Sequence, residues 1–127
     1  MANVPAGATG TDSASRSQNE QVYGLVRSAE SGLTALAGGA QAGTALQYAI
    51  NRFTTVATGG DSAQLPPATV GREVIVINAG ASSMNVFPQT GEAIDAGAAN
   101  AARAVANAKT CIFFCAVAGT WNSLLGA

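Results

Sequence analysis

The stretch Glu73-Val74-Ile75-Val76-Ile77-Asn78 decides the fold that we expect of this chain. Its run of β-branched residues favours extended backbone over helix, which makes it the strongest strand signal in the sequence. Both faces of such a strand are apolar, so we expect it to lie centrally in a sheet and to be covered on both sides. The turn residues Ala79–Ser83 follow, and Met84–Phe87 is predicted as the returning strand, with Met84 and Val86 on one face.

Weaker strand signals precede this pair. The residues from Ile50 to Val56 favour a strand through their β-branched and aromatic content, whereas the stretch before them, from Gln41, fits either a helical turn or a bulged strand. Thr58–Ser62 is a turn cluster by composition, and Ala63–Leu65 is a short strand that two prolines stop. Val22–Val26 is a further short strand candidate.

The C-terminal third alternates turns and short extended pieces. Pro88–Gly91 is a turn in which Gly91 offers a position of positive φ, and Glu92–Asp95 is briefly extended. Residues 96–108 are ambiguous, because alanine favours helix while Gly97 and two asparagines interrupt it. We favour a strand over residues 103–106.

The turn Asn107-Ala108-Lys109 is predicted to join that strand to a longer one, Thr110–Val117, in a hairpin. After a final turn at residues 118–120, Trp121–Leu125 ends the chain, and we expect Trp121 to cap the core.

Short strands with turn signals at intervals of about 8–12 residues predict an all-β fold, a small β-sandwich or jelly-roll-like module. No fixed-period repeat is long enough to predict a solenoid or a propeller. Residues 1–21 are mostly small and polar and predict an extended N-terminal arm, which is either a disordered tail or a segment that docks on a partner. The β-sandwich module is expected over residues 22–127.

Composition limits the functions that this chain can have. Of its 127 residues 48% are hydrophobic and only 10% charged, so we expect other copies or a partner to cover part of the surface. The absence of histidine excludes His-based acid–base catalysis and His-ligated metal sites. A net charge of −1 with scattered basic residues argues against nucleic-acid binding. No apolar run has the length of a membrane-spanning helix, and the N-terminus has no features of a secretory signal, so we expect no Sec export.

The two cysteines, Cys111 and Cys115, lie four residues apart in a predicted strand. At that spacing their Cα atoms would be about 13 Å apart, and a disulfide needs about 7 Å or less. We therefore expect two buried free thiols, consistent with synthesis in a reducing compartment. A metal site is not expected, because no other ligands accompany them.

The remaining candidates for chemistry have simpler explanations. Glu92 and Asp95 are interpreted as solvated loop carboxylates rather than a catalytic pair, since nothing around them suggests a sugar cleft. Gly38-Gly39 and Gly59-Gly60 do not match phosphate-binding loops. Asp61 is interpreted as a turn residue rather than a calcium ligand, and Asn78 as a turn-initiating side chain. We predict no catalytic, cofactor-binding or metal-binding residues and no enzyme.

Three short turn motifs in this sequence resemble those of a known class of module. They are Gln64-Leu65-Pro66-Pro67, Ile77-Asn78-Ala79-Gly80 and Phe87-Pro88-Gln89-Thr90-Gly91. Together with the strand runs around them, from residue 44 to Trp121, they resemble a β-rich module of tailed-bacteriophage virion proteins. Such modules occur in head decoration (cement) proteins and in head- or tail-fibre proteins.

The resemblance implies a non-enzymatic and commonly trimeric part of the virion, without cofactors. One small module with an arm suits a decoration protein, whose partners would be the major capsid protein and copies of itself, with no nucleic acid and no membrane. Its expected location is the outer capsid surface, after synthesis in the host bacterial cytoplasm. The alternative is a short fibre or receptor-binding module, which would need exposed aromatic residues in turns. The candidates are Tyr23, Tyr48 and Trp121, of which we expect Trp121 in the core.

Overall fold

The computed structural model describes residues 26–126 of the chain, and every regular element in this range is a β-strand. The predicted arm 1–21 and most of the candidate strand at 22–26 lie outside the described residues, and Val26 itself is not in a strand. The strands are β1 (Ala29–Thr34), β2 (Thr44–Ala45), β3 (Ile50–Thr55), β4 (Asp61–Gln64), β5 (Glu73–Asn78), β6 (Met84–Phe87), β7 (Ala93–Ile94), β8 (Arg103–Val105), β9 (Lys109–Val117) and β10 (Thr120–Leu125). The all-β expectation is confirmed.

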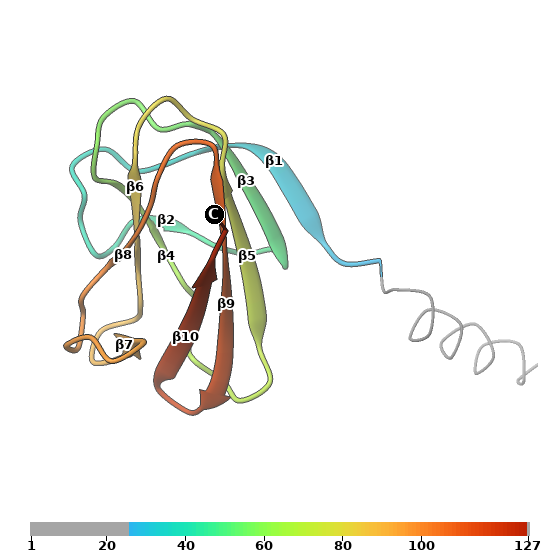
Figure 1. Cartoon of the computed structure of the whole chain (residues 1–127), viewed down its shortest axis with the longest axis vertical. Helices are drawn as coiled ribbons and strands as arrows, with labels where there is room; N and C mark the ends of the chain where they lie inside the picture. The colour runs from blue at the N-terminus through green and yellow to red at the C-terminus, as the bar shows by residue number, and fades with distance from the viewer. Residues whose placement is uncertain (1–25, 127) are drawn as a thin grey trace, which may run out of the picture.

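The strands form two sheets that face each other. One has six strands in the order β1-β3-β5-β9-β10-β7, and the other has four in the order β2-β4-β6-β8. Figure 1 shows the four-stranded sheet on the left and β1, β3, β5 and β9 on the right. The core lies between these two layers.

The first six strands alternate between the two sheets. Strands β1, β3 and β5 pair in parallel in one sheet, and β2, β4 and β6 pair in parallel in the other. The chain therefore winds as a short β-solenoid, each coil contributing one strand to each sheet. This arrangement differs from the jelly-roll-like topology expected from the sequence, which is built from antiparallel strands.

The expectation that no solenoid would form was wrong because backbone pairing joins successive coils, and this pairing does not depend on a repeated sequence. Parallel pairing needs no repeated side chains. Phe53 of β3, for example, stands in register with Asn78 of β5, so equivalent positions of successive coils carry unrelated residues. A search for a sequence repeat cannot detect such coils.

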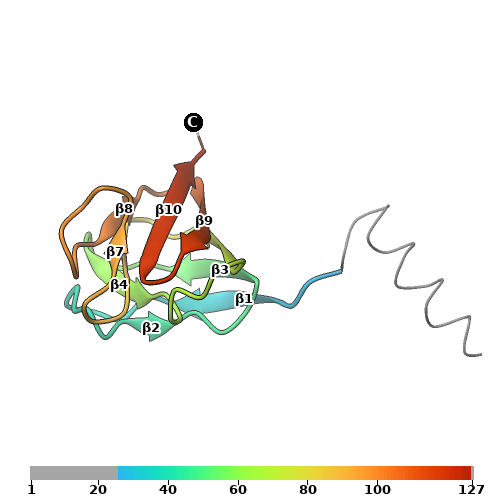
Figure 2. The same ribbon diagram turned by 90° about the horizontal axis from the view of Figure 1, so that it is seen from below.

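The last four strands close the solenoid. Strand β9 pairs antiparallel with β5 and with β10, β8 pairs antiparallel with β6, and β7 pairs in parallel with β10. Figure 2 shows the β9–β10 hairpin on the opposite side of the molecule from β1, which is one edge strand of the six-stranded sheet; the short β7 is the other. The solenoid thus begins at β1 at one end, and the β9–β10 hairpin extends its sheet at the other end.

The core contains apolar side chains from both sheets, and the single tryptophan, Trp121, is fully buried in it, as predicted. From the six-stranded sheet come Phe53, Val74, Val76, Cys111, Phe113 and Trp121, and from the four-stranded sheet and its ends Ala63, Leu65, Met84, Val86 and Val105. Met84 and Val86 share the inward face of β6, also as predicted.

The residues that decide the fold form β5, third in the six-stranded sheet, so its predicted central position is confirmed. The predicted cover on both sides is wrong, because Ile75 and Ile77 on the outer face are only half-buried. The returning strand was also placed wrongly. Strand β6 pairs with β4 and β8 in the opposite sheet instead of with β5.

The turns lie close to their predicted positions. Gly91 has a φ of 85°, as its place in a tight turn requires. Residues 103–105 form a strand as favoured, but the turn at Asn107 and Ala108 carries the chain from one sheet to the other instead of closing a hairpin. Before β3 the described chain has the short strand β2 and no helical turn. Within residues 26–126 no helix has the length and hydropathy of a membrane span.

Candidate interaction surface

A row of four branched aliphatic residues crosses the outer face of the six-stranded sheet. Ile50 on β3 is in register with Ile75 on β5, Ile75 with Ile112 on β9, and Ile112 with Leu124 on β10. Neighbouring strands lie about 4.8 Å apart, so these side chains form a continuous stripe. We call these four residues the apolar row.

Strand alternation places the apolar row on the outside. Each isoleucine of the row has at least one buried neighbour along its strand, such as Asn51 beside Ile50 and Cys111 beside Ile112. Leu124 lies between two half-buried residues of β10. The three isoleucines are half-buried by their neighbours, whereas Leu124 is 60% exposed. Phe114, 38% exposed, extends the apolar surface along β9.

Charged side chains border the apolar row without interrupting it. Glu73 precedes Ile75 by one outward position on β5, and Arg52 follows Ile50 by one outward position on β3. Arg52 donates to Ser31 Oγ at 3.1 Å. An apolar centre with polar residues at its margin is typical of protein interfaces.

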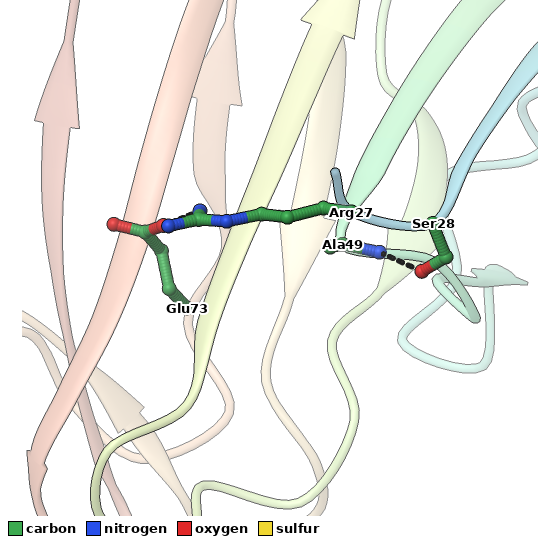
Figure 3. Close-up of polar contacts among 4 residues, drawn as sticks. All are labelled: Arg27, Ser28, Ala49 and Glu73. Carbon is green, nitrogen blue, oxygen red and sulfur yellow. Dashed lines mark hydrogen bonds and ion pairs between the residues drawn. The ribbon is translucent and has the colours of Figure 1, made fainter. Parts of the chain in front are cut away.

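The edge of this sheet is fixed by two contacts from the residues before β1. Arg27 reaches along the sheet to form an ion pair with the Glu73 carboxylate, and Ser28 Oγ accepts a hydrogen bond from Ala49 N at 3.0 Å (Figure 3). The Ser28 carbonyl also accepts from Ile50 N at 3.0 Å. Because both partners of the ion pair are partly exposed, it contributes about 1 kcal/mol or less, and it connects the residues before β1 to β5, the second strand along from β1 in the sheet.

The two glycine pairs singled out in the sequence come together in space. Gly38-Gly39 and Gly59-Gly60 line one hollow of about 310 Å³ with Asp61 and Asn85. A Cβ on Gly39 would lie 2.6 Å from the Gly60 carbonyl oxygen, so the close approach requires glycine. Asp61 is buried at the start of β4, and its carboxylate accepts from Thr58 N at 3.0 Å, so its side chain closes the turn that precedes the strand.

Glu92 and Asp95 bind backbone groups instead of lying free in solvent, which corrects their interpretation as solvated carboxylates. Both oxygens of Glu92 accept from Ala68 N at 3.1 Å. Asp95 accepts from Ser123 N at 2.8 Å and from Ser123 Oγ at 2.6 Å. The two carboxylates thus bind different segments, Glu92 the loop before β5 and Asp95 the strand β10. No three His, Cys, Asp or Glu side chains within residues 26–126 converge in a group that could hold a metal ion.

Cys111 and Cys115 both lie on β9, and both are buried free thiols, as predicted. Burial raises the pKa of Cys111 above its ordinary value, and the Arg103 guanidinium beside it partly offsets that effect. A buried neutral thiol is a poor nucleophile. Asn78 also has its predicted turn role, since its Oδ1 accepts from Gly80 N at 2.9 Å.

The three aromatic candidates for ligand binding differ in where they lie. Trp121 is in the core, Tyr23 lies outside the described residues, and Tyr48 lines a groove of about 690 Å³.

Sequence reasoning missed both this groove and the apolar row. The alternation in Glu73–Asn78 contained the signal for the row, but the assumption of a strand covered on both sides concealed it. Comparison of the chain with protein-family models, with curated proteins and with solved structures finds no match.

Proposed function

We propose that this protein is a bacteriophage capsid decoration protein that binds the outer surface of the major capsid protein shell and stabilises it through subunit contacts. The observation that carries the proposal is the apolar row on the outer face of the six-stranded sheet. The resemblance of residues 44–121 to virion modules provides the class of partner.

The chemistry of the chain supports adhesion over catalysis. Only 10% of its residues are charged, so covering the sheet face removes few charges from water. Leu124 and Phe114 offer exposed apolar surface that a partner would desolvate. Among the described residues the carboxylates and thiols of the former candidate sites are engaged in hydrogen bonds or buried.

The proposed mechanism is thermodynamic. A protein that binds the assembled shell and not its free subunits adds its binding free energy to the assembly alone, and the shell becomes more stable by mass action. In this proposal the apolar row faces the major capsid protein, and three copies of the chain associate around a threefold axis, which multiplies weak contacts into firm attachment.

The test is to strip the protein from particles and to measure their resistance to heat. We expect stripped particles to release DNA at a lower temperature and re-addition of the purified chain to restore the original value. Sedimentation of the free chain reports its oligomeric state, and electron microscopy of the particles locates it. Unchanged heat resistance together with no binding to stripped shells would overturn the proposal.

The alternative is a short head-fibre, tail-fibre or receptor-binding module of the virion. The groove lined by Tyr48 favours it, because a receptor-binding module needs a site for a host-surface ligand. The same images separate the two proposals, since density at the tail or on a projecting fibre supports this alternative and density across the shell supports decoration.

A further inference from the structure

The groove of about 690 Å³ opens at one end of the solenoid, where β2 and β4 end and β3 and β5 begin. Its walls are formed by Ala45, Leu46, Gln47, Tyr48, Ala49, Gln64, Leu65, Pro66, Arg72, Glu73 and Gln89. Its volume falls in the range of small-molecule sites, about 300–1,000 Å³. The groove is separate from the apolar row, none of whose four residues lines it.

Three side-chain carboxamides line the groove: Gln47, Gln64 and Gln89. Gln89 is held in place, because its Nε2 donates to the Leu65 carbonyl at 2.8 Å. The amides of Gln47 and Gln64 make no hydrogen bond to another residue of the described range 26–126. A carboxamide both donates and accepts, so these groups match ligand hydroxyls, which also do both.

The charges at the groove balance. Arg72 and Glu73 are its charged residues, with formal charges of opposite sign. Arg72 Nη1 donates to the Pro67 carbonyl at 2.8 Å, and Glu73 forms the ion pair with Arg27. An anionic or cationic ligand would find both charges already engaged. A ligand without net charge suits these walls better.

The groove also offers the apolar ring of Tyr48 beside its amides. Leu46 and Leu65 are buried beneath it, and Tyr48 is half-buried in its wall. The backbone of Tyr48 is held by the buried Asn51, whose Nδ2 donates to the Tyr48 carbonyl at 2.7 Å and whose Oδ1 accepts from Tyr48 N at 3.3 Å. A tyrosine on a fixed backbone presents an apolar body with a polar tip, which suits a ligand that has both kinds of surface.

We infer that this groove binds a neutral oligosaccharide. Sugar rings combine hydroxyl groups, for the amides of Gln47 and Gln64, with apolar C–H faces, for the ring of Tyr48. This activity is additional to shell binding. It gives a particle that carries the chain a contact for a glycan surface, and it does not depend on where in the virion the chain lies.

The experiment uses the purified full chain on an array of neutral and uronic-acid-containing oligosaccharides, followed by calorimetric titration with the best neutral binder. We expect binding of neutral oligosaccharides with a Kd of the order of micromolar to millimolar. The double variant Q47A/Q64A loses roughly tenfold or more in affinity, because it removes two hydrogen-bonding groups. Tyr48→Ala weakens binding similarly, whereas Tyr48→Phe, which keeps the ring, retains most of it.

Asn122→Ala is the matched control, because it removes an exposed carboxamide on β10, outside the groove, and is expected to leave affinity unchanged. Circular dichroism of each variant verifies that it is folded. Binding of the acidic oligosaccharides alone, no binding of neutral ones, or neutral binding that is unaffected by Q47A/Q64A would each overturn the inference. The shell proposal is tested on stripped particles without any sugar, so the failure of one is distinguishable from the failure of the other.

Discussion

The side-chain Nδ2 of Asn78 on β5 donates a hydrogen bond to the backbone carbonyl of Val105 on β8, at 2.8 Å, and both residues are fully buried. This bond joins the six-stranded sheet to the four-stranded one. The same amide donates to the Ser82 carbonyl at 2.9 Å and accepts from Gly80 N at 2.9 Å. One side chain therefore fixes the turn after β5 and the end of β8 together.

Replacement of Asn78 by leucine is expected to lower the free energy of unfolding by roughly 2–4 kcal/mol, because it leaves buried backbone groups unpaired. Urea denaturation followed by the fluorescence of the single tryptophan, the buried Trp121, measures the change. The control is Asn122→Ala, an exposed asparagine on β10, with an expected change within about 0.5 kcal/mol. Equal stabilities for the two variants would show that the Asn78 bonds contribute nothing measurable.

Gly80 is packed against the backbone of Val56, and we expect Gly80→Ala to destabilise the protein by about 1–3 kcal/mol. A Cβ there would lie 2.7 Å from Val56 N, a backbone atom that cannot turn aside as a flexible side chain can. The matched control is Gly59→Ala, where an added Cβ meets nothing within 4 Å and φ is not positive. That control should be neutral or slightly stabilising. Thermal unfolding compares them, and a tolerated Gly80→Ala would show that the turn relaxes freely.

The sequence predicted which segments are strands better than which strands are neighbours. The β-branched run of β5 and the β-branched and aromatic residues of β9 predict strands wherever these segments lie in the fold, because strand preference is largely local. Pairing is not local. The five residues from Ala79 to Ser83 can close a hairpin or carry the chain to the other sheet, and here they do the latter.

The groove could not be predicted because its walls come from distant segments. Gln47, Gln64 and Gln89 become neighbours only because successive coils stack in parallel. The apolar row has the same origin. Its members are unremarkable one by one in the sequence, and the register of four strands aligns them. The alternation along Glu73–Asn78 indicates an outward apolar face on that one strand, but a sequence without a visible repeat does not show which strands lie beside it.

Leu124→Ser tests the apolar row without disturbing the core. Leu124 is 60% exposed, so the free energy of unfolding should change by only about 0.5 kcal/mol or less. If the row faces the capsid protein, affinity for stripped shells should fall by roughly tenfold or more. Val117→Ser is the matched control, since Val117 is 66% exposed but lies outside the row. Co-sedimentation with shells measures both variants, and equal affinities would show that the row is not the docking face.

Cys111 should make stability depend on alkaline pH. Its pKa is raised in the folded chain by burial, so above the ordinary thiol pKa the unfolded chain has lost a proton that the folded chain still holds. The contribution of this thiol to the free energy of unfolding is therefore fully present at neutral pH. Above the ordinary thiol pKa it falls as pH rises, by at most about 1.4 kcal/mol per pH unit for one proton.

The measurement is urea denaturation at a series of pH values from neutral to alkaline, for the original chain and for Cys111→Ala. The variant should be less stable at neutral pH, because it leaves a cavity where a fully buried side chain stood. The difference between the two chains should then shrink as pH rises, because alanine has no proton to lose. A difference that stays constant across the series would mean that the thiol ionises equally in the folded and unfolded chains, contrary to its burial in β9.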